Sequence, residues 1–342
     1  MIAMRIVVPP ELSGRTLDLL CEAPAVTSVV FFEGAAQKPA GDVILADVAR
    51  EEASIIVDAL KELDIPRVGT IALEVIDSSI SDEADRAEKE ASGLPSDAVV
   101  WEEVESRTSE NTELGSSFLG FMVIAMLIAA IGVMNDAPIL IIGAMVVGPE
   151  FGPLAGLSVA IVQRRRDLAR KSLLALAAGF AAGIVVTYLA TLLARAVSIA
   201  PDQIAEAGRP LTQFISNPDA FSVVVAFLAG VAGILSLTSA KSGALIGVLI
   251  SVTTIPAAGN IAAAAAYRDW SECGGAVAQL SVNLVMLVLA GVLTLSVQRR
   301  LYTSRRKGHL EAPYRAAAGL PMGRRRRSGD APGKTPEKER GH

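Results

Sequence analysis

The sequence predicts an α+β protein in which a small soluble domain precedes an all-α membrane domain. Hydrophobic residues make up 51% of the 342 residues, and their longest runs are confined to residues 116–298. Charge is divided as sharply, with 24 acidic and 9 basic side chains in residues 1–115 but 13 basic and 4 acidic ones in residues 299–342. A membrane domain flanked by two soluble ends of opposite charge accounts for this distribution.

The first 78 residues alternate strand-like and helical patterns. Strand-like MRIVV, VTSVVFF, DVILADV and GTIALEVI are separated by helical ELSGRTLDLLCE and EEASIIVDALKEL. The second helix places Ile55, Ile56, Ala59, Leu60 and Leu63 on one face. The resulting order, βαββαβ, is that of a ferredoxin-like domain. Because this segment contains neither a phosphate-binding loop nor a metal-ligand cluster, we interpret it as a structural or regulatory domain, with ligand binding as the alternative.

The segments on either side of the membrane domain are polar. Residues 79–115 are acidic and contain Pro95, which predicts a linker with one short helix at about residues 97–107. Trp101 in this helix is expected to pack on the soluble domain, with a position at the membrane interface as the alternative. Residues 299–342 are rich in Pro, Gly and Arg and predict a disordered basic tail. Since no Phe, Trp or Tyr lies in or after its arginine run at residues 324–327, we expect this tail to be attracted to anionic lipid and not to nucleic acid.

Six apolar segments are long enough to cross the ~30 Å hydrocarbon core of a bilayer as helices. The basic loop QRRRDLARK after the second segment should remain in the cytoplasm. An even number of spans then places both termini, and with them the soluble domain and the tail, on the cytoplasmic side. Cys21 and Cys273 fall on opposite sides of the membrane, so no disulfide is expected. The predicted spans are 116–134, 137–162, 172–195, 219–238, 243–266 and 275–297.

Two stretches a hundred residues apart resemble each other. GAMVVGPEFGPLAGLSVAIVQRRRD starts at Gly143 and GALIGVLISVTTIPAAGNIAAAAAYRD starts at Gly243; both open with Gly-Ala, carry Pro-x-x-Gly near the middle and end in Arg-Asp. If a unit of three spans is repeated once, the odd number of spans makes the second copy enter the membrane from the side opposite to the first. This predicts an inverted 3+3 repeat with discontinuous helices. Matched interruptions in inverted repeats are typical of a transporter's substrate site.

The motif GPEFGP interrupts the second predicted span. Pro149 and Pro153 have no amide hydrogen, so the carbonyl groups of Met145 and Pro149 lose their helical partners. Gly148 and Gly152 can adopt the backbone angles that a break requires. The span is therefore expected to split into two half-helices, with Pro153 in the first turn of the second one.

Glu150 lies near the centre of this span, where an acidic residue costs ~2.5–3.5 kcal/mol on insertion scales. A carboxylate beside freed carbonyl groups is an oxygen-only environment, suited to a proton, Na⁺ or a cationic group. The second interruption offers the hydroxyl groups of Ser251, Thr253 and Thr254, the carbonyl group of Val252 that Pro256 frees, and the amide of Asn260. The last span adds Gln279 and Asn283. In the alternative interpretation Glu150 caps the second half-helix, and the hydroxyl groups bond back to their own helices. The candidate substrate- or ion-binding residues are Glu150, Met145, Gly148, Pro149, Gly152, Pro153, Thr253, Thr254, Pro256, Asn260 and Asn283.

The stretch NDAPILIIGAMVVGPEFGPLAGL, together with GDVILADVAREEAS and GTIALEVIDSSIS upstream, resembles domain-of-unknown-function family 389, a family of uncharacterised bacterial hydrophobic membrane proteins. The similarity extends over roughly residues 4–300. It implies an integral, multi-pass protein of the bacterial inner (plasma) membrane, with this region as the common core and a soluble domain fused to its N-terminus. The resemblance implies no particular activity.

These observations favour a secondary transporter or channel-like permease for a small solute or ion, regulated by its cytoplasmic domain. The alternative is a membrane-anchored signalling or scaffold protein whose soluble domain senses a ligand. No Walker motif is present and both histidines, His309 and His342, lie in the tail, so we expect neither an enzyme nor a cofactor. The expected partners are the lipid bilayer and a small solute or cation (H⁺ or Na⁺), with a homo-oligomer as an open alternative.

Overall fold

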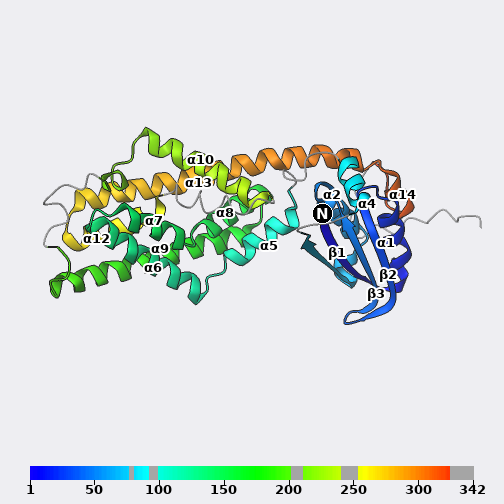
Figure 1. Cartoon of the computed structure of the whole chain (residues 1–342), viewed down its shortest axis with the longest axis horizontal. Helices are drawn as coiled ribbons and strands as arrows, with labels where there is room; N and C mark the ends of the chain where they lie inside the picture. Colours follow the sequence, from blue (N-terminus) through cyan, green and yellow to red (C-terminus); the bar gives the residue numbers. More distant parts are fainter. Residues whose placement is uncertain (77–80, 92–98, 202–210, 240–252, 324–342) are drawn as a thin grey trace, which may run out of the picture. The chain divides into compact units, whose positions relative to one another are not determined.

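The computed structural model describes residues 1–76, 81–91, 99–201, 211–239 and 253–323. The chain forms two compact units (Figure 1). The sheet unit comprises residues 1–103 together with the chain from residue 298 onward, and the helical unit comprises residues 104–297. Each unit is described separately below.

The sheet unit is built on a four-stranded antiparallel sheet with the strand order β2-β3-β1-β4. Its elements confirm the predicted order of strands and helices, with one additional helical turn, α3. Alternate side chains of β1 are buried in a core that also takes the apolar faces of α1 and α2. The elements are β1 (Ile2–Val8), α1 (Pro10–Glu22), β2 (Val26–Gln37), β3 (Ala40–Val48), α2 (Arg50–Glu62), α3 (Ile65–Val68) and β4 (Thr70–Val75).

The described part of residues 79–115 contains two helices, α4 (Asp82–Glu90) and α5 (Trp101–Asn111), where we predicted one. The predicted packing of Trp101 is confirmed, because its ring meets the ring of Tyr302 edge-on at a centroid distance of 6.2 Å within the sheet unit. The backbone N–H of Trp101 donates to Ser54, whose hydroxyl group donates to Glu102 at 2.6 Å. These contacts fix the first turn of α5.

The structure differs from the predicted disordered tail between residues 299 and 323. Helix α13 (Trp270–His309) extends beyond the last predicted span, and α14 (Pro313–Ala317) packs on α1. Tyr314, Ala318 and Leu320 belong to the core of the sheet unit. We predicted disorder because arginines dominate the composition of the tail, and this average did not reveal the short apolar segment within it. The rest of the predicted tail, residues 324–342, lies outside the described residues.

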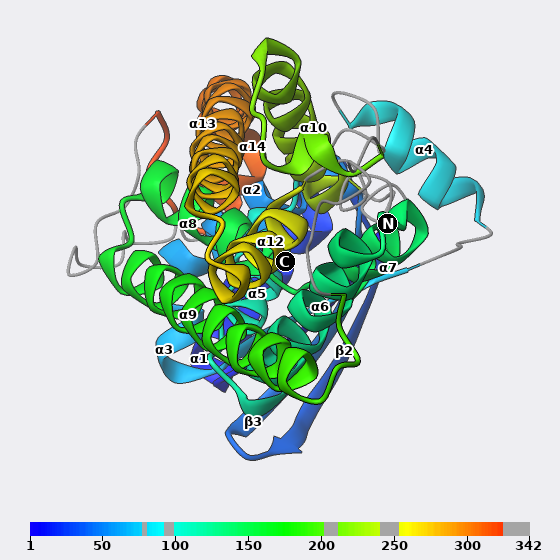
Figure 2. The same cartoon turned by 90° about the vertical axis from the view of Figure 1, so that its left-hand side faces the viewer.

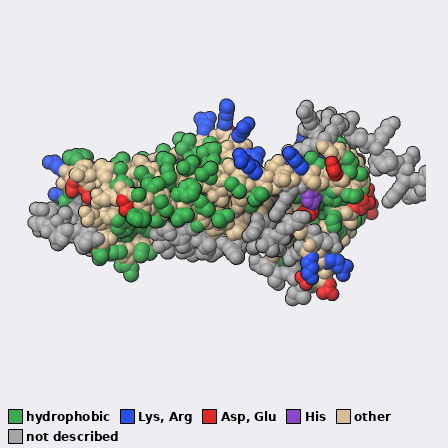
Figure 3. Space-filling model, turned by 90° about the horizontal axis from the view of Figure 1, so that it is seen from above, with side chains coloured by type: hydrophobic (Ala, Val, Ile, Leu, Met, Phe, Trp, Pro, Cys, Tyr) green, Lys and Arg blue, Asp and Glu red, His purple; other side chains and the backbone are tan. Residues whose placement is uncertain are grey.

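The described residues of the helical unit contain four helices long and apolar enough to cross a membrane, namely α6, α9, α10 and α13, or five spans if the bent pair α7 and α8 counts as one. Figure 3 shows hydrophobic side chains covering most of one face of this unit. The fifth predicted span, 243–266, starts outside the described residues, so the count of six stays a prediction. The elements are α6 (Ser116–Met134), α7 (Pro138–Val147), α8 (Phe151–Gln163), α9 (Arg166–Ala196), a 3-10 turn (Gln213–Ile215), α10 (Ala220–Thr238), α12 (Thr254–Tyr267) and α13 up to Val297.

Glycines allow the helices of this unit to pack closely. A Cβ atom on Gly179 of α9 would lie 2.8 Å from the ring of Phe118, and one on Gly183 would overlap Met126, both on α6. Gly259 of α12 lies equally close to Ala129 of α6. Figure 2 shows α12 between α9 and α13. Small residues at such spacing are typical of membrane helix interfaces.

Candidate functional site

The GPEFGP motif interrupts the helix as predicted. Helix α7 ends at Val147, α8 begins at Phe151, and the two helices are bent by 51° at the break. The N–H of Gly148 makes the last helical hydrogen bond of α7, to the carbonyl oxygen of Ala144 at 3.1 Å. Pro149 cannot continue the series because it has no N–H to donate. The break therefore follows directly from the proline chemistry.

Glu150 precedes the first residue of α8 but does not cap that helix with its side chain. Its carboxyl group turns instead to α12, where Oε1 accepts a hydrogen bond of 2.6 Å from the hydroxyl group of Thr254. Glu150 is 4% exposed, and Thr254, the first residue of α12, is fully buried. The capping alternative is therefore not what the structure shows. The two interrupted segments meet, start to start, through one buried hydrogen bond.

The second carboxyl oxygen of Glu150, Oε2, has no hydrogen-bond partner among the described residues. Its surroundings are tight, because a Cβ atom on Gly148 would overlap both Oε2 and the side chain of Ile255. An unpaired buried carboxylate oxygen is expensive, whereas a protonated oxygen or one bound to a cation is much less so. The geometry thus provides an oxygen that a proton or a cation can occupy.

A second polar cluster surrounds Thr253, the residue before α12. Its Oγ1 accepts hydrogen bonds from Nδ2 of Asn283 at 2.9 Å and from Nε2 of Gln279 at 3.4 Å. Gln279 also donates to Oδ1 of Asn283 at 3.2 Å, one turn along α13. Both amide side chains are 2% exposed, and Oε1 of Gln279 has no partner among the described residues. Since Thr253 and Thr254 are adjacent, this neutral cluster adjoins the carboxyl group of Glu150.

The structure does not bring all the predicted site residues to this centre. Asn260 lies between one and two turns farther along α12 than Thr254. Its Nδ2 donates to Glu272 of α13 at 2.9 Å. Met145 belongs to an apolar cluster with Val133 and Ile141. The two prolines that start helices, Pro153 and Pro256, are buried in the first turns of α8 and α12. Ser251 and Val252, which the second interruption was expected to contribute, lie outside the described residues.

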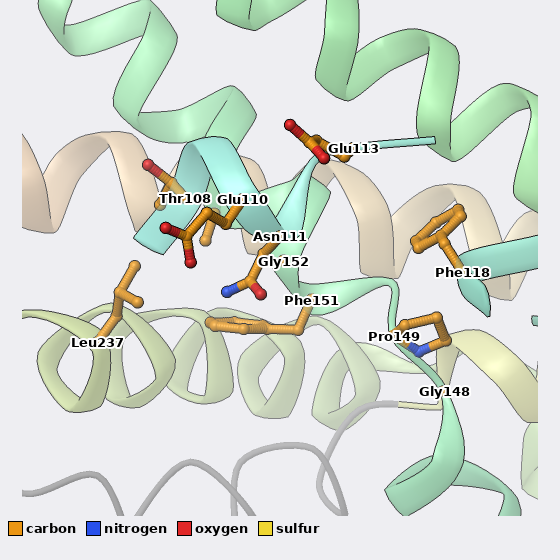
Figure 4. A pocket seen from close by; sticks show the side chains of 11 residues that line it. Thr108, Glu110, Asn111, Glu113, Phe118, Gly148, Pro149, Phe151, Gly152 and Leu237 are labelled. Atoms are coloured by element: carbon orange, nitrogen blue, oxygen red, sulfur yellow. The ribbon is translucent and has the colours of Figure 1, made fainter. Parts of the chain in front are cut away.

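A cavity of about 320 Å³ opens beside the break (Figure 4). Gly148, Pro149 and Phe151 line one side of it, and Figure 4 shows Glu110 and Asn111 at the end of α5 pointing toward the ring of Phe151. The remaining lining residues are Thr108, Glu113, Phe118, Gly152, Ala155 and Leu237. Glu150 itself is absent from the lining, since its side chain turns toward α12.

The contribution of α5 was missed from the sequence. A Cβ atom on Gly152 would lie 2.7 Å from Cβ of Asn111, and one on Gly156 would overlap Thr112. Arg165 after α8 pairs with Glu105 on α5. We interpreted residues 79–115 as a linker because of their charge. The detectable signal was the pair Gly152 and Gly156, whose spacing of four marks a face of α8 that accepts another helix.

This fold and site define a membrane protein with a broken helix pair around a buried acid. Residues 145–289 match the family model described as Domain of unknown function (DUF389), which confirms the predicted resemblance. The matched region contains the break, α12 and the Gln279 and Asn283 pair. The uncharacterized protein MJ0678 of Methanocaldococcus jannaschii is 25% identical over 208 residues, which cover 58% of this chain and 59% of that protein. No solved structure matches the chain significantly.

Proposed function

We propose that this protein is a secondary transporter or channel-like permease for a small solute or ion, and that Glu150 is the residue that takes part in cation movement. The observation that carries this proposal is the hydrogen bond between Glu150 and Thr254, which joins the starts of α8 and α12 and leaves Oε2 of Glu150 unpartnered among the described residues. Interrupted helices that meet around a polar centre are typical of transporter substrate sites.

A purely structural role would not require an acid at this position. An ionisable residue at this depth costs free energy, and such residues mark ion or proton pathways in many membrane proteins. An amide or a hydroxyl group would serve equally well to join α12 to the break. The acid is therefore better explained by a charge that changes during the working cycle.

The chemistry of the centre favours a monovalent cation. Glu150 is the single carboxylate there, and the neighbouring cluster of Thr253, Gln279 and Asn283 is neutral. Within the described residues no three His, Cys, Asp or Glu side chains come together as a metal site. Divalent ions such as Ca²⁺ usually take six to eight oxygen ligands, several of them carboxylates. One negative charge matches H⁺ or Na⁺.

We further propose that the sheet unit is a ferredoxin-like regulatory domain and that it lies in the cytoplasm, with both termini, at a bacterial inner membrane. The strand order β2-β3-β1-β4, in which β3 separates β1 from β2 and β1 separates β3 from β4, supports the fold assignment. The basic loop at Arg164 to Arg166 supports the orientation. The inverted 3+3 repeat, the six spans and the absence of enzymatic activity are part of the same proposal.

Transport is tested with purified protein in liposomes, using a pH-sensitive dye for protons and a sodium-sensitive dye for Na⁺ under imposed gradients and membrane potentials. We expect cation flux that Glu150→Gln abolishes, because the glutamine keeps the size and hydrogen-bonding capacity of the side chain but not its charge. Asp167→Asn, an exposed acid in the first turn of α9, is the matched control and should retain wild-type flux. Equal flux from Glu150→Gln and wild type, or no flux under any gradient, would favour the signalling alternative.

A further inference from the structure

The cation that Glu150 takes, and the route by which it arrives, can be argued further from the geometry. Resting on the proposed transport function, we propose that Glu150 carries a proton, and that the proton arrives from the cavity beside α5 past Gly148, the residue that lines the cavity and adjoins Oε2 of Glu150.

The surroundings of Oε2 favour a proton over a metal ion. A Cβ atom added to Gly148 would meet Oε2 itself and the apolar side chain of Ile255. The other carboxyl oxygen is already bonded to Thr254. A metal ion needs a shell of several oxygen ligands, whereas a proton needs one oxygen. A single free oxygen against an apolar wall therefore fits a proton.

Gly148 connects the cavity with Glu150. It lines the cavity, and it is also the residue whose Cβ atom would overlap Oε2. Its backbone angles, φ −65° and ψ 127°, are accessible to any residue, so the backbone does not require a glycine here. A side chain is excluded here because Oε2 of Glu150 and the side chain of Ile255 already occupy the position of a Cβ atom. One residue without a side chain separates the cavity from the buried oxygen.

The cavity carries the charge expected of a proton entrance. Glu110 points into it, and Glu113 also lines it, both exposed at the end of α5 (Figure 4). A pocket lined by negative charge raises the local concentration of cations, protons included. Phe118 and Leu237 supply the apolar part of the wall. On the proposed route a proton passes Glu110 and Glu113 before it reaches Gly148.

Among the described residues, charged groups near the break are Glu110 and Glu113 in the cavity, and Glu272 of α13 bonds to Asn260 farther along α12. Helices α6, α7, α8, α10 and α12 contain no Asp, Glu, Lys or Arg. From α12 the group that faces Glu150 is the hydroxyl group of Thr254, and α13 contributes only the neutral Gln279 and Asn283 nearby. Arg195 of α9 is bonded to the carbonyl oxygen of Ala266 at the far end of α12.

The proposal is tested by infrared difference spectroscopy on the full-length protein in lipid. Protonated Glu150 gives a carboxylic C=O stretching band that is absent in Glu150→Gln, that disappears as the pH rises, and that does not respond to Na⁺ at constant pH. Transfer into D2O shifts this band, and the rate of the shift measures proton access. We expect Gly148→Ala to slow the shift by about tenfold or more, since an overlap of this kind raises the barrier to passage. Gly143→Ala on α7, where a Cβ atom meets nothing within 4 Å, should exchange like wild type.

Each outcome decides a separate point. A titrating band with slow exchange in Gly148→Ala supports the proposal. A band that Na⁺ removes at constant pH overturns the proton assignment in favour of a sodium site, and equal exchange in both alanine variants overturns the passage. If no band is lost in Glu150→Gln, Glu150 is not a proton carrier. If Gly148→Ala folds poorly, the variant Gly148→Ala with Ile255→Ala relieves one overlap and keeps that with Oε2. Failure of transport itself appears in the liposome flux and leaves the band unaffected, so the two failures are distinguishable.

Discussion

The hydrogen bond between Thr254 and Glu150 yields the sharpest prediction. Thr254→Val replaces the hydroxyl group by a methyl group of nearly the same size and leaves Oε1 of Glu150 without its donor. Neutral hydrogen bonds between membrane helices contribute about 0.6 kcal/mol on average. Hydrogen bonds to charged groups contribute about 1.5–3 kcal/mol. Because both oxygens of Glu150 would then lack partners among the described residues, we expect a loss of about 1–2 kcal/mol in the free energy of unfolding.

The loss is measured by reversible unfolding of the purified protein in mixed micelles, in a cycle with Glu150→Gln. Thr191→Val is the matched control, since Thr191 is equally buried and its hydroxyl group bonds within its own helix, to Thr187 at 2.8 Å. The control should cost less than about 1 kcal/mol. We expect the cost of Thr254→Val to fall by at least about 0.5 kcal/mol when Glu150 is already glutamine, the lower end of coupling between contacting residues. Equal costs in both backgrounds would refute the reasoning that these two side chains are coupled.

Three further predictions concern packing and charge. Gly183→Val should destabilise the helical unit by about 1–3 kcal/mol because it drives a side chain into α6, and Gly120→Val, with open space around it, should not; unfolding in mixed micelles measures both. Hydrogen bonds from Ser13 and Gly34 hold the pKa of Asp42 below its usual range, so its stabilising contribution is present above pH ~4 and is lost as the pH falls further. The acid sensitivity of sheet-unit unfolding should therefore be smaller in Asp42→Asn, as near-UV circular dichroism between pH 6 and 3 would reveal. Arg315→Ala should cost about 3 kcal/mol, because it removes a buried partner of Glu62 at 2.8 Å, whereas the more exposed Lys61→Ala should cost under about 1 kcal/mol by chemical denaturation.

Local chemistry made the break and the strand order predictable. Two prolines four residues apart cannot sit in one helix, so the division at Gly148 to Glu150 follows from the sequence alone. The likeness between the two interrupted segments also led to Thr254, because residues at equivalent breaks were expected to meet. The apolar face predicted for the second helix, with Ile56, Ala59 and Leu60, is likewise buried in the core of the sheet unit.

Packing partners far apart in the sequence could not be predicted in the same way. Asn260 was expected at the centre, but its amide group bonds to Glu272, and nothing in the local pattern distinguishes these two outcomes. The acidic composition of α5 concealed a face that packs on Gly152 and Gly156. The arginines of the tail concealed Tyr314 and Leu320, which are buried in the sheet unit. In α5 and in the tail, the average composition gave no sign of the few residues whose burial decides the fold.

The meeting of two helix starts has a consequence for the proposed proton site. Helices α8 and α12, of 13 and 14 residues, both begin at the contact between Glu150 and Thr254. The start of a helix carries a partial positive charge, which favours a nearby negative group. Burial in an apolar environment favours the neutral form of the same group. A proton carrier needs both forms to be accessible, and these two opposing effects act on one carboxyl group here. We therefore propose that its position at the ends of broken helices, rather than in the middle of a continuous one, lets Glu150 release a proton as well as hold it.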